Sequence, residues 1–275
     1  MRFARDKTLE VRARRGLLVF ALLTIGGTSA IDVHLHERPS WMLVRMWTPG
    51  IASLLTRLLL REGLRDISLR FDVRQSMLLG LAWVYPIVVI TTAYGLGWTT
   101  GLEPIQPGTT AGDVASSLVR SATWWFALGL VSAAGEELGW RGYMLPRLVD
   151  ARIPNPIGVS GLLWWAWHLP LVLTGQLVAG PHPLLVALML LPSIMAFGVI
   201  AALLRFASGS VWPAVVLHAS FNAVMDVTFD PLTAPRPGGS IWTGAAGLLV
   251  GLVSSIGALL VWRLARGRWR YRLER

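Results

Sequence analysis

The chain has 275 residues, of which 54% are hydrophobic and 15% are charged, and its net charge is +10. Because a soluble globular domain carries about 25% charged residues, this composition disfavours a soluble enzyme. The absence of cysteine excludes disulfide scaffolds, thiol catalysis and zinc sites built on thiolates.

Eight stretches of the chain are apolar enough to be considered as transmembrane helices, which need about 20 mostly apolar residues. They are residues 17–33, 42–60, 76–98, 117–135, 156–173, 184–204, 211–228 and 241–262. We therefore expect an all-α, polytopic membrane bundle of about eight helices, with residues 1–275 forming a single domain. The first stretch is short and follows basic residues, so a cleaved signal peptide is an alternative for it.

The basic residues are distributed unevenly between the connecting segments. Twenty of the 25 lie in segments 1–16, 61–75, 136–153, 205–210 and 263–275. The segments on the other side hold only Arg38 and Arg236. By the positive-inside rule, both termini are cytoplasmic in a multi-pass cell-membrane protein. Arg45, Arg57 and Arg120 lie near span ends, where we expect them to snorkel. The basic tails are expected to contact anionic lipid, and we expect no nucleic-acid partner.

Two glutamates and an arginine follow the fourth predicted span. Glu137 and Arg141 are four residues apart, so on a helix they share a face and can form an ion pair. Glu136 projects about 100° away and has no local basic partner. An interfacial ion pair therefore explains Glu137 and Arg141, and it leaves Glu136 unexplained.

Two histidines and an asparagine are predicted to lie inside later spans. His168 is 12 residues beyond Pro156, which places it about 18 Å into its span. His218 and Asn222 are four residues apart and share a helix face that Asp226 continues. Each could be a buried group that is satisfied by interhelical hydrogen bonds. Their conjunction favours a functional site, because an ionisable group at mid-membrane costs roughly 2.5–3.5 kcal/mol.

The predicted depths of these residues constrain the fourth span. A helix that ended at residue 135 would leave Glu136 near the membrane surface, far from His168. We therefore predict that this helix continues past Glu136 and through Tyr143, and that Gly135, Gly139 and Gly142 let a neighbouring helix approach it. We expect a polar cavity between the fourth, fifth and seventh spans that opens to the cytoplasm.

These residue types suit hydrolysis of an amide bond by activated water. A carboxylate such as Glu136 can accept a proton from water and return it to the leaving amine. A neutral His168 can hold that water directly or through a metal, and His218 and Asn222 can donate hydrogen bonds to an oxyanion. Glu136, His168 and His218 could form a three-ligand zinc site with an open position, or they could act without metal.

Three motifs in this order resemble the CPBP family of intramembrane proteases, which includes type II CAAX prenyl endopeptidases and bacteriocin-processing or immunity proteins. They are Glu136-Glu137-x-x-x-Arg141, Trp164-x-x-x-His168 and His218-x-x-x-Asn222. The resemblance covers roughly residues 117–226, which we expect to be the catalytic core.

The resemblance implies a role for each motif residue. Glu136 would activate water with the assistance of His168. His218 and Asn222 would stabilise the oxyanion. The supporting residues Glu137 and Arg141 would orient the first carboxylate and hold the helix. Trp164 departs from the family pattern, which usually has phenylalanine there.

Two other classes of protein compete with this one. A rhomboid-like serine protease could use Ser160 of Gly158-x-Ser160-Gly161, but His168 lies about 12 Å away along the helix, which is too far for a nucleophile–base contact. A non-enzymatic binding or immunity protein, or a transporter, could use the same polar groups for another purpose. The eight spans lack the paired hydropathy symmetry of a transporter, which argues against transport.

The substrate is a peptide or a membrane protein in every enzymatic interpretation. CAAX processing, bacteriocin or peptide processing and self-immunity all stay open. Arginine outnumbers lysine 24 to 1, which hints at a GC-rich bacterial genome, where prenylated proteins are not expected.

Overall fold

The computed structural model of the protein describes residues 2–35, 38–64, 67–71, 75–177, 182–236 and 239–273. Within these ranges the chain folds into helices, and its β-pairing is one isolated bridge between Ile105 and Thr233. The predicted all-α fold is therefore confirmed.

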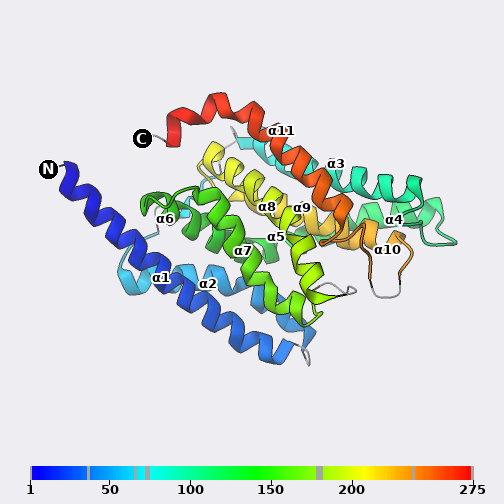
Figure 1. The fold of residues 1–275 in the computed structure, drawn as a ribbon, viewed down its shortest axis with the longest axis horizontal. Helices are drawn as coiled ribbons and strands as arrows, with labels where there is room; N and C mark the ends of the chain where they lie inside the picture. Colours follow the sequence, from blue (N-terminus) through cyan, green and yellow to red (C-terminus); the bar gives the residue numbers. More distant parts are fainter. Residues whose placement is uncertain are drawn as a thin grey trace.

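Helical elements follow one another along the chain, and among them η1 is a 3₁₀-helix while η4 and η5 are π-helices. In chain order they are α1 (Arg2–Leu35), η1 (Pro39–Trp41), α2 (Met42–Leu60), α3 (Ser76–Thr100), α4 (Ala111–Ala122), α5 (Trp124–Gly139), η4 (Trp140–Met144), α6 (Leu145–Asp150), α7 (Pro156–Leu173), α8 (Pro183–Ser208), α9 (Trp212–Asn222), η5 (Ala223–Phe229), α10 (Asp230–Leu232) and α11 (Leu248–Leu273). In Figure 1, α8 lies at the centre of the bundle and packs against α7 and α11.

Six helical runs among the described residues are long and apolar enough to cross a membrane. They are Lys7–Leu35, Ser76–Thr100, Ala111–Asp150, Pro156–Leu173, Pro183–Ser208 and Leu248–Ala265. The protein is therefore a multi-pass membrane protein. Predicted spans 42–60 and 211–228 are helical, as α2 and as the run from α9 to η5, but they do not meet the same criterion.

The last helix starts later than the sequence pattern predicted. Residues 241–247 form a turn in which Gly244 adopts a φ of 83°, and the amide of Leu248 donates to the carbonyl of Ile241. Glycine adopts this left-handed conformation without a steric penalty. The turn brings Gly244 to the wall of the central cavity of the bundle.

The helix that carries Glu136 continues past it, as predicted. α5 runs directly into the π-helix η4 and then into α6, so the helical run ends only at Asp150. Gly135 and Gly139 allow α2 to lie against α5, because an added Cβ at Gly139 would come within 2.4 Å of Pro49. This close packing sets the depth of Glu136 in the bundle.

The expectation that Arg45 and Arg57 snorkel to the membrane surface is wrong. Their exposed fractions are 1% and 2%. Arg57 donates to the carbonyls of Gly63 and Gly142 and lies over the ring of Tyr143. Backbone carbonyls and aromatic faces in the interior therefore take the place of water and lipid head groups. Arg120 is exposed and donates to Ser117, near the end of α4.

Three of the segments rich in basic residues meet at one end of the bundle, which we call the basic end. There, residues of α1, the end of α2 and α6 border one pocket. At the opposite, neutral end, segments 99–116 and 229–240 meet, and the amide of Ala234 donates to the carbonyl of Pro104. The start of α1 and the end of α11 lie on the same side of the bundle in Figure 1. The assignment of the basic end to the cytoplasm stays a prediction.

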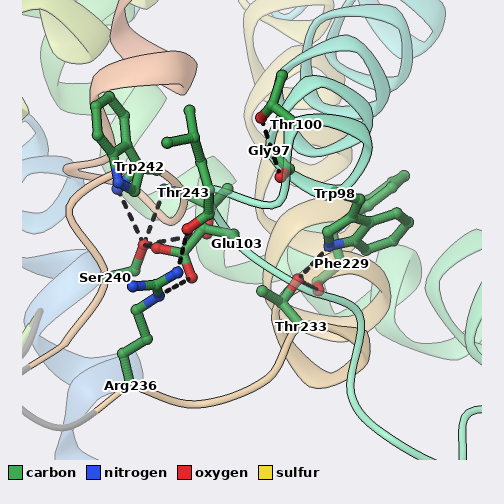
Figure 2. Close-up of polar contacts among 11 residues, drawn as sticks. Gly97, Trp98, Thr100, Glu103, Phe229, Thr233, Arg236, Ser240, Trp242 and Thr243 are labelled. Atoms are coloured by element: carbon green, nitrogen blue, oxygen red, sulfur yellow. Dashed lines mark hydrogen bonds and ion pairs between the residues drawn. The ribbon is translucent and has the colours of Figure 1, made fainter.

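A buried carboxylate ties the two neutral-end segments together (Figure 2). Glu103 is fully buried and accepts hydrogen bonds from Nε of Arg236 at 3.0 Å and from Oγ of Ser240 at 2.5 Å. The Ser240 hydroxyl in turn accepts the amide of Thr243 at 2.9 Å. This clamp holds the segment that carries Gly244 into the cavity wall.

Candidate active site

A cavity of about 560 Å³ lies among α2, α5, α7, α8 and the run from α9 to α10. Glu136, His168, His218 and Asn222 all line it. The structure thus brings together four side chains that lie on three separate helical runs and span more than eighty positions of the chain. Their catalytic roles stay predictions.

Trp164 holds the carboxylate of Glu136. Its indole Nε1–H donates a hydrogen bond of 2.8 Å to Oε2 of Glu136, and both residues are buried. The same ring lies edge-on to His168, with centroids 5.2 Å apart, and to His218, at 5.6 Å. The guanidinium of Arg141 sits over the ring, 4.6 Å from its centroid. One side chain therefore contacts each of the three motifs.

Glu137 is the hub of a buried ion network. Its Oε1 atom accepts from Nη1 of Arg141 at 3.0 Å, as the spacing of four residues predicted. The same atom lies 2.9 Å from Nδ1 of His218, a contact that the sequence did not predict. Since a carboxylate oxygen accepts, Nδ1 of His218 carries a proton. Its Nε2 atom can then donate to a ligand once the ring carries both protons.

His168 has a defined orientation as well. Its Nδ1 atom lies 2.8 Å from the carbonyl oxygen of Trp164, which can only accept. The proton of a neutral ring is therefore on Nδ1, and Nε2 is left as an acceptor. His168 and Glu136 line the same cavity, where such an acceptor and a carboxylate can hold a water molecule between them.

Glu136, His168 and His218 are residue types that bind zinc, so the spacing of the side chains is the feature to compare with a zinc site. Among the described residues, no three His, Cys, Asp or Glu side chains are grouped so that they could hold a metal ion. The zinc site expected at Glu136, His168 and His218 stays a prediction, and no step of the proposed mechanism passes through a metal. A chelation test decides whether activity depends on zinc.

Arg45 also lines the cavity, although the sequence had predicted that it snorkels to the membrane surface. Its guanidinium donates to Asp32 at 2.7 Å and to the carbonyl of Trp167 at 2.9 Å, and it stacks on the indole of Trp167. An arginine inside a membrane span is a functional candidate by default, so the sequence contained a signal that could have identified Arg45. Because Arg45 lies close to a span end, that signal was interpreted as snorkelling.

Two aspartates complete the wall at the neutral end. Asp226 continues the stripe of His218 and Asn222, as predicted, and Asp230 extends it by one more turn. The phenol of Tyr94 donates to Asp230. The intervening residues form the π-helix η5, a wider turn that keeps positions four apart facing the same cavity.

The cavity is closed at Glu136 and open at the neutral end. Glu136 is buried, whereas Asp226 and Asp230 are exposed and Gln176 is half-buried. The opening towards the cytoplasm was expected because Glu136 follows the fourth predicted span at its basic end, but the exposed lining residues lie at the neutral end. If the basic end is cytoplasmic, the open end faces away from the cytoplasm.

The comparison with protein families agrees with this geometry. The family model described as Rce1-like, type II CAAX prenyl endopeptidase Rce1-like, matches residues 118–224. That range contains all three motifs and nearly coincides with the expected core, residues 117–226. No curated protein matches the chain. The resemblance that the motifs indicated is therefore confirmed, and over residues 118–224 the chain is similar to the Rce1-like type II CAAX prenyl endopeptidases, which supports an intramembrane endopeptidase as its general class.

Proposed function

We propose that the protein is an intramembrane endopeptidase that hydrolyses a peptide bond with water activated by Glu136. The observation that carries the proposal is the convergence of Glu136, His168, His218 and Asn222 on one cavity. A scattered arrangement of these groups, facing lipid or separate cavities, would have removed the chemical basis for hydrolysis.

The first step is attack by water. Glu136 accepts a proton from a water molecule that also donates to Nε2 of His168, and the water oxygen attacks the carbonyl carbon of the scissile bond. The indole of Trp164 keeps one oxygen of Glu136 in place, which leaves the other free to act as base. Holding the base in place accelerates the reaction, because the entropy of orienting the base and the water has already been lost before the chemical step.

The second step is collapse of the tetrahedral intermediate. Its oxyanion accepts hydrogen bonds from Nε2 of His218 and from the side-chain amide of Asn222. Glu137 and Arg141 hold His218 in this orientation. Glu136 then gives its proton to the amide nitrogen, the carbon–nitrogen bond breaks, and the amine and carboxylic acid products leave.

The substrate is proposed to be a peptide segment or a membrane protein. CAAX-type, bacteriocin and self-immunity substrates are all compatible with a cavity of this size. The sequence predicted cleavage near the cytoplasmic leaflet, but the exposed lining residues favour access from the neutral end. Labelling experiments must therefore test from which side of the membrane the substrate enters the cavity.

The experiment compares membranes that contain the natural chain with membranes that contain Glu136→Gln or His168→Ala. Mass spectrometry of released peptides should detect cleavage products that disappear in both variants, while expression is unchanged. Glu10→Gln, which alters a carboxylate on the surface of α1, serves as the matched control. Unchanged biological activity in both variants would leave a binding or immunity protein instead.

Chelation adds a second arm to the same experiment. Cleavage that survives a chelator supports direct activation of water by Glu136. Loss of cleavage that returns on addition of Zn²⁺ would show that the zinc expectation was right and that the ligand set rearranges on binding.

A further inference from the structure

A second pocket, of about 520 Å³, lies at the basic end and shares no lining residue with the proposed catalytic cavity. It is formed where α1, the end of α2 and α6 come together. Its charged lining residues are Arg12, Arg15, Arg61, Glu62, Arg147 and Asp150. The proposed mechanism uses none of them.

The charges in this pocket are not balanced. Arg147 donates to Glu62 at 2.8 Å and approaches Asp150 at 3.4 Å, so both carboxylates are already engaged by one arginine. Four guanidinium groups against two carboxylates leave an excess of two positive charges. An anionic ligand would therefore be attracted into the pocket.

Three arginines are available to such a ligand. Arg12, Arg15 and Arg61 are exposed, and none of their guanidinium groups forms a hydrogen bond or an ion pair with another residue in the described part of the chain. They reach the pocket from two elements, α1 and the end of α2. A guanidinium presents a planar pair of N–H donors that matches the oxygens of a phosphate, so three of them can surround one phosphate group.

The surroundings of the pocket distinguish a lipid from a soluble anion. Leu9 lines the pocket and is half exposed. Leu58 and Leu59, on the last turn of α2 next to the pocket, have exposed fractions of 74% and 65%. The arginines thus stand at the end of a surface that is apolar and unburied within the protein. A head group in the pocket would place its acyl chains along that surface.

We propose that this pocket binds the head group of an anionic phospholipid, with phosphate oxygens on Arg12, Arg15 and Arg61 and the acyl chains against Leu58 and Leu59. Basic pockets between helices at the membrane surface are suited to head groups of this charge. The bound lipid bridges α1 and the end of α2 beside α6, whose Arg147 already forms an ion pair with Glu62, next to the end of α2.

The position of α6 gives this binding a structural consequence. α6 continues the helical run that carries Glu136, so a lipid held between α1, α2 and α6 restrains that run where it finishes, at the basic end. A ligand that binds only the folded protein stabilises it in proportion to the logarithm of its concentration relative to Kd. We therefore expect anionic phospholipid to raise the melting temperature of the protein in detergent.

The test uses the purified full chain in a neutral detergent. Native mass spectrometry and thermal melting are measured with phosphatidylglycerol, with phosphatidylcholine and with inorganic phosphate. The natural chain should retain phosphatidylglycerol selectively, and its melting temperature should rise. The triple variant Arg12→Gln, Arg15→Gln, Arg61→Gln should bind it at least tenfold more weakly.

The matched control is Arg14→Gln. Arg14 lies on the same helix between two of the pocket arginines, but it pairs with Glu10 and does not line the pocket. This variant should retain the lipid like the natural chain. Equal retention by the triple variant, or an equal response to phosphatidylcholine, overturns the proposal. An equal response to inorganic phosphate shows an anion site that does not select lipid and also overturns it.

If the triple variant does not fold, the three single variants carry the test. Each should lower retention more than Arg14→Gln does, and a set in which none differs from that control overturns the proposal. Because the readout is lipid binding, the result does not depend on whether the protein is a protease.

Discussion

The indole Nε1 of Trp164, in α7, and the carboxylate oxygen Oε2 of Glu136, in α5, lie 2.8 Å apart. This hydrogen bond joins two helices that are not consecutive in the chain. The family pattern usually has phenylalanine where this chain has Trp164, and a phenyl ring cannot donate such a hydrogen bond. The departure therefore adds a direct link between the second motif and the carboxylate of the first.

Trp164→Phe should lower kcat and reduce stability while leaving KM nearly unchanged. The ring keeps its packing against His168 and His218, but Glu136 loses a hydrogen bond worth about 1.5–3 kcal/mol, or roughly a 10- to 100-fold change in rate. The control is Trp165→Phe, which removes a 2.8 Å indole hydrogen bond to the carbonyl of Ala187, away from the carboxylate. Equal kinetics in the two variants would contradict the role of Trp164.

Asn222→Ala should reduce kcat by about 100- to 1000-fold, because loss of one oxyanion donor costs about 2.7–4 kcal/mol in the transition state. Asn155→Ala is a suitable control. Asn155 caps α7 by accepting the amide of Gly158, so its loss should cost about 0.5–2 kcal/mol of stability without a change in kcat. Peptide-cleavage kinetics and thermal melting separate the two effects. A normal kcat in Asn222→Ala would remove Asn222 from the mechanism.

Glu137→Gln should reduce both stability and activity, unlike Glu136→Gln. Its carboxylate is shared by Arg141 and His218, and all three groups are buried. Breaking a buried ion pair from one side leaves an uncompensated charge and costs about 3–5 kcal/mol. Melting in detergent and cleavage assays on the same preparation measure both losses. A variant that melts like the natural chain would show that water or another group takes over the role of Glu137.

Glu103→Ala should lower stability by about 1–3 kcal/mol, since it removes the acceptor on which the two neutral-end segments depend (Figure 2). Glu10→Ala, which removes a surface ion pair with Arg14, should change stability by less than about 1 kcal/mol. Thermal melting compares the two variants. Equal melting temperatures would mean that the clamp is not required to hold the segment beside Gly244.

The absence of cysteine makes single-cysteine labelling a direct test of orientation. If the basic end is cytoplasmic, a membrane-impermeant maleimide added outside intact cells should label Gln106→Cys and spare Arg14→Cys. Labelling of Gln176→Cys, at the open end of the cavity, should also block cleavage. The reverse labelling pattern would place the cavity mouth at the cytoplasmic face, where the sequence had predicted it.

Most of the helices were predictable from the sequence because each apolar run must satisfy its backbone hydrogen bonds internally. The ion pair of Glu137 and Arg141 was predictable for a similar reason, since a spacing of four residues is a local property of a helix. Arg45 was misjudged because its surroundings come from α1 and α7, far away in sequence.

The sequence by itself determined the membrane class, the helices and the residue types that could perform hydrolysis, because hydropathy, charge bias and helical spacing act over short stretches of chain. Only the tertiary structure decided that Trp164 holds Glu136, that Glu137 reaches His218, and that the cavity is open beside Asp226. These contacts join helices across tens of residues, and their geometry depends on how closely the helices pack. Small residues such as Gly139 allow helices to pack closely, but the sequence does not specify which helix will pack against them.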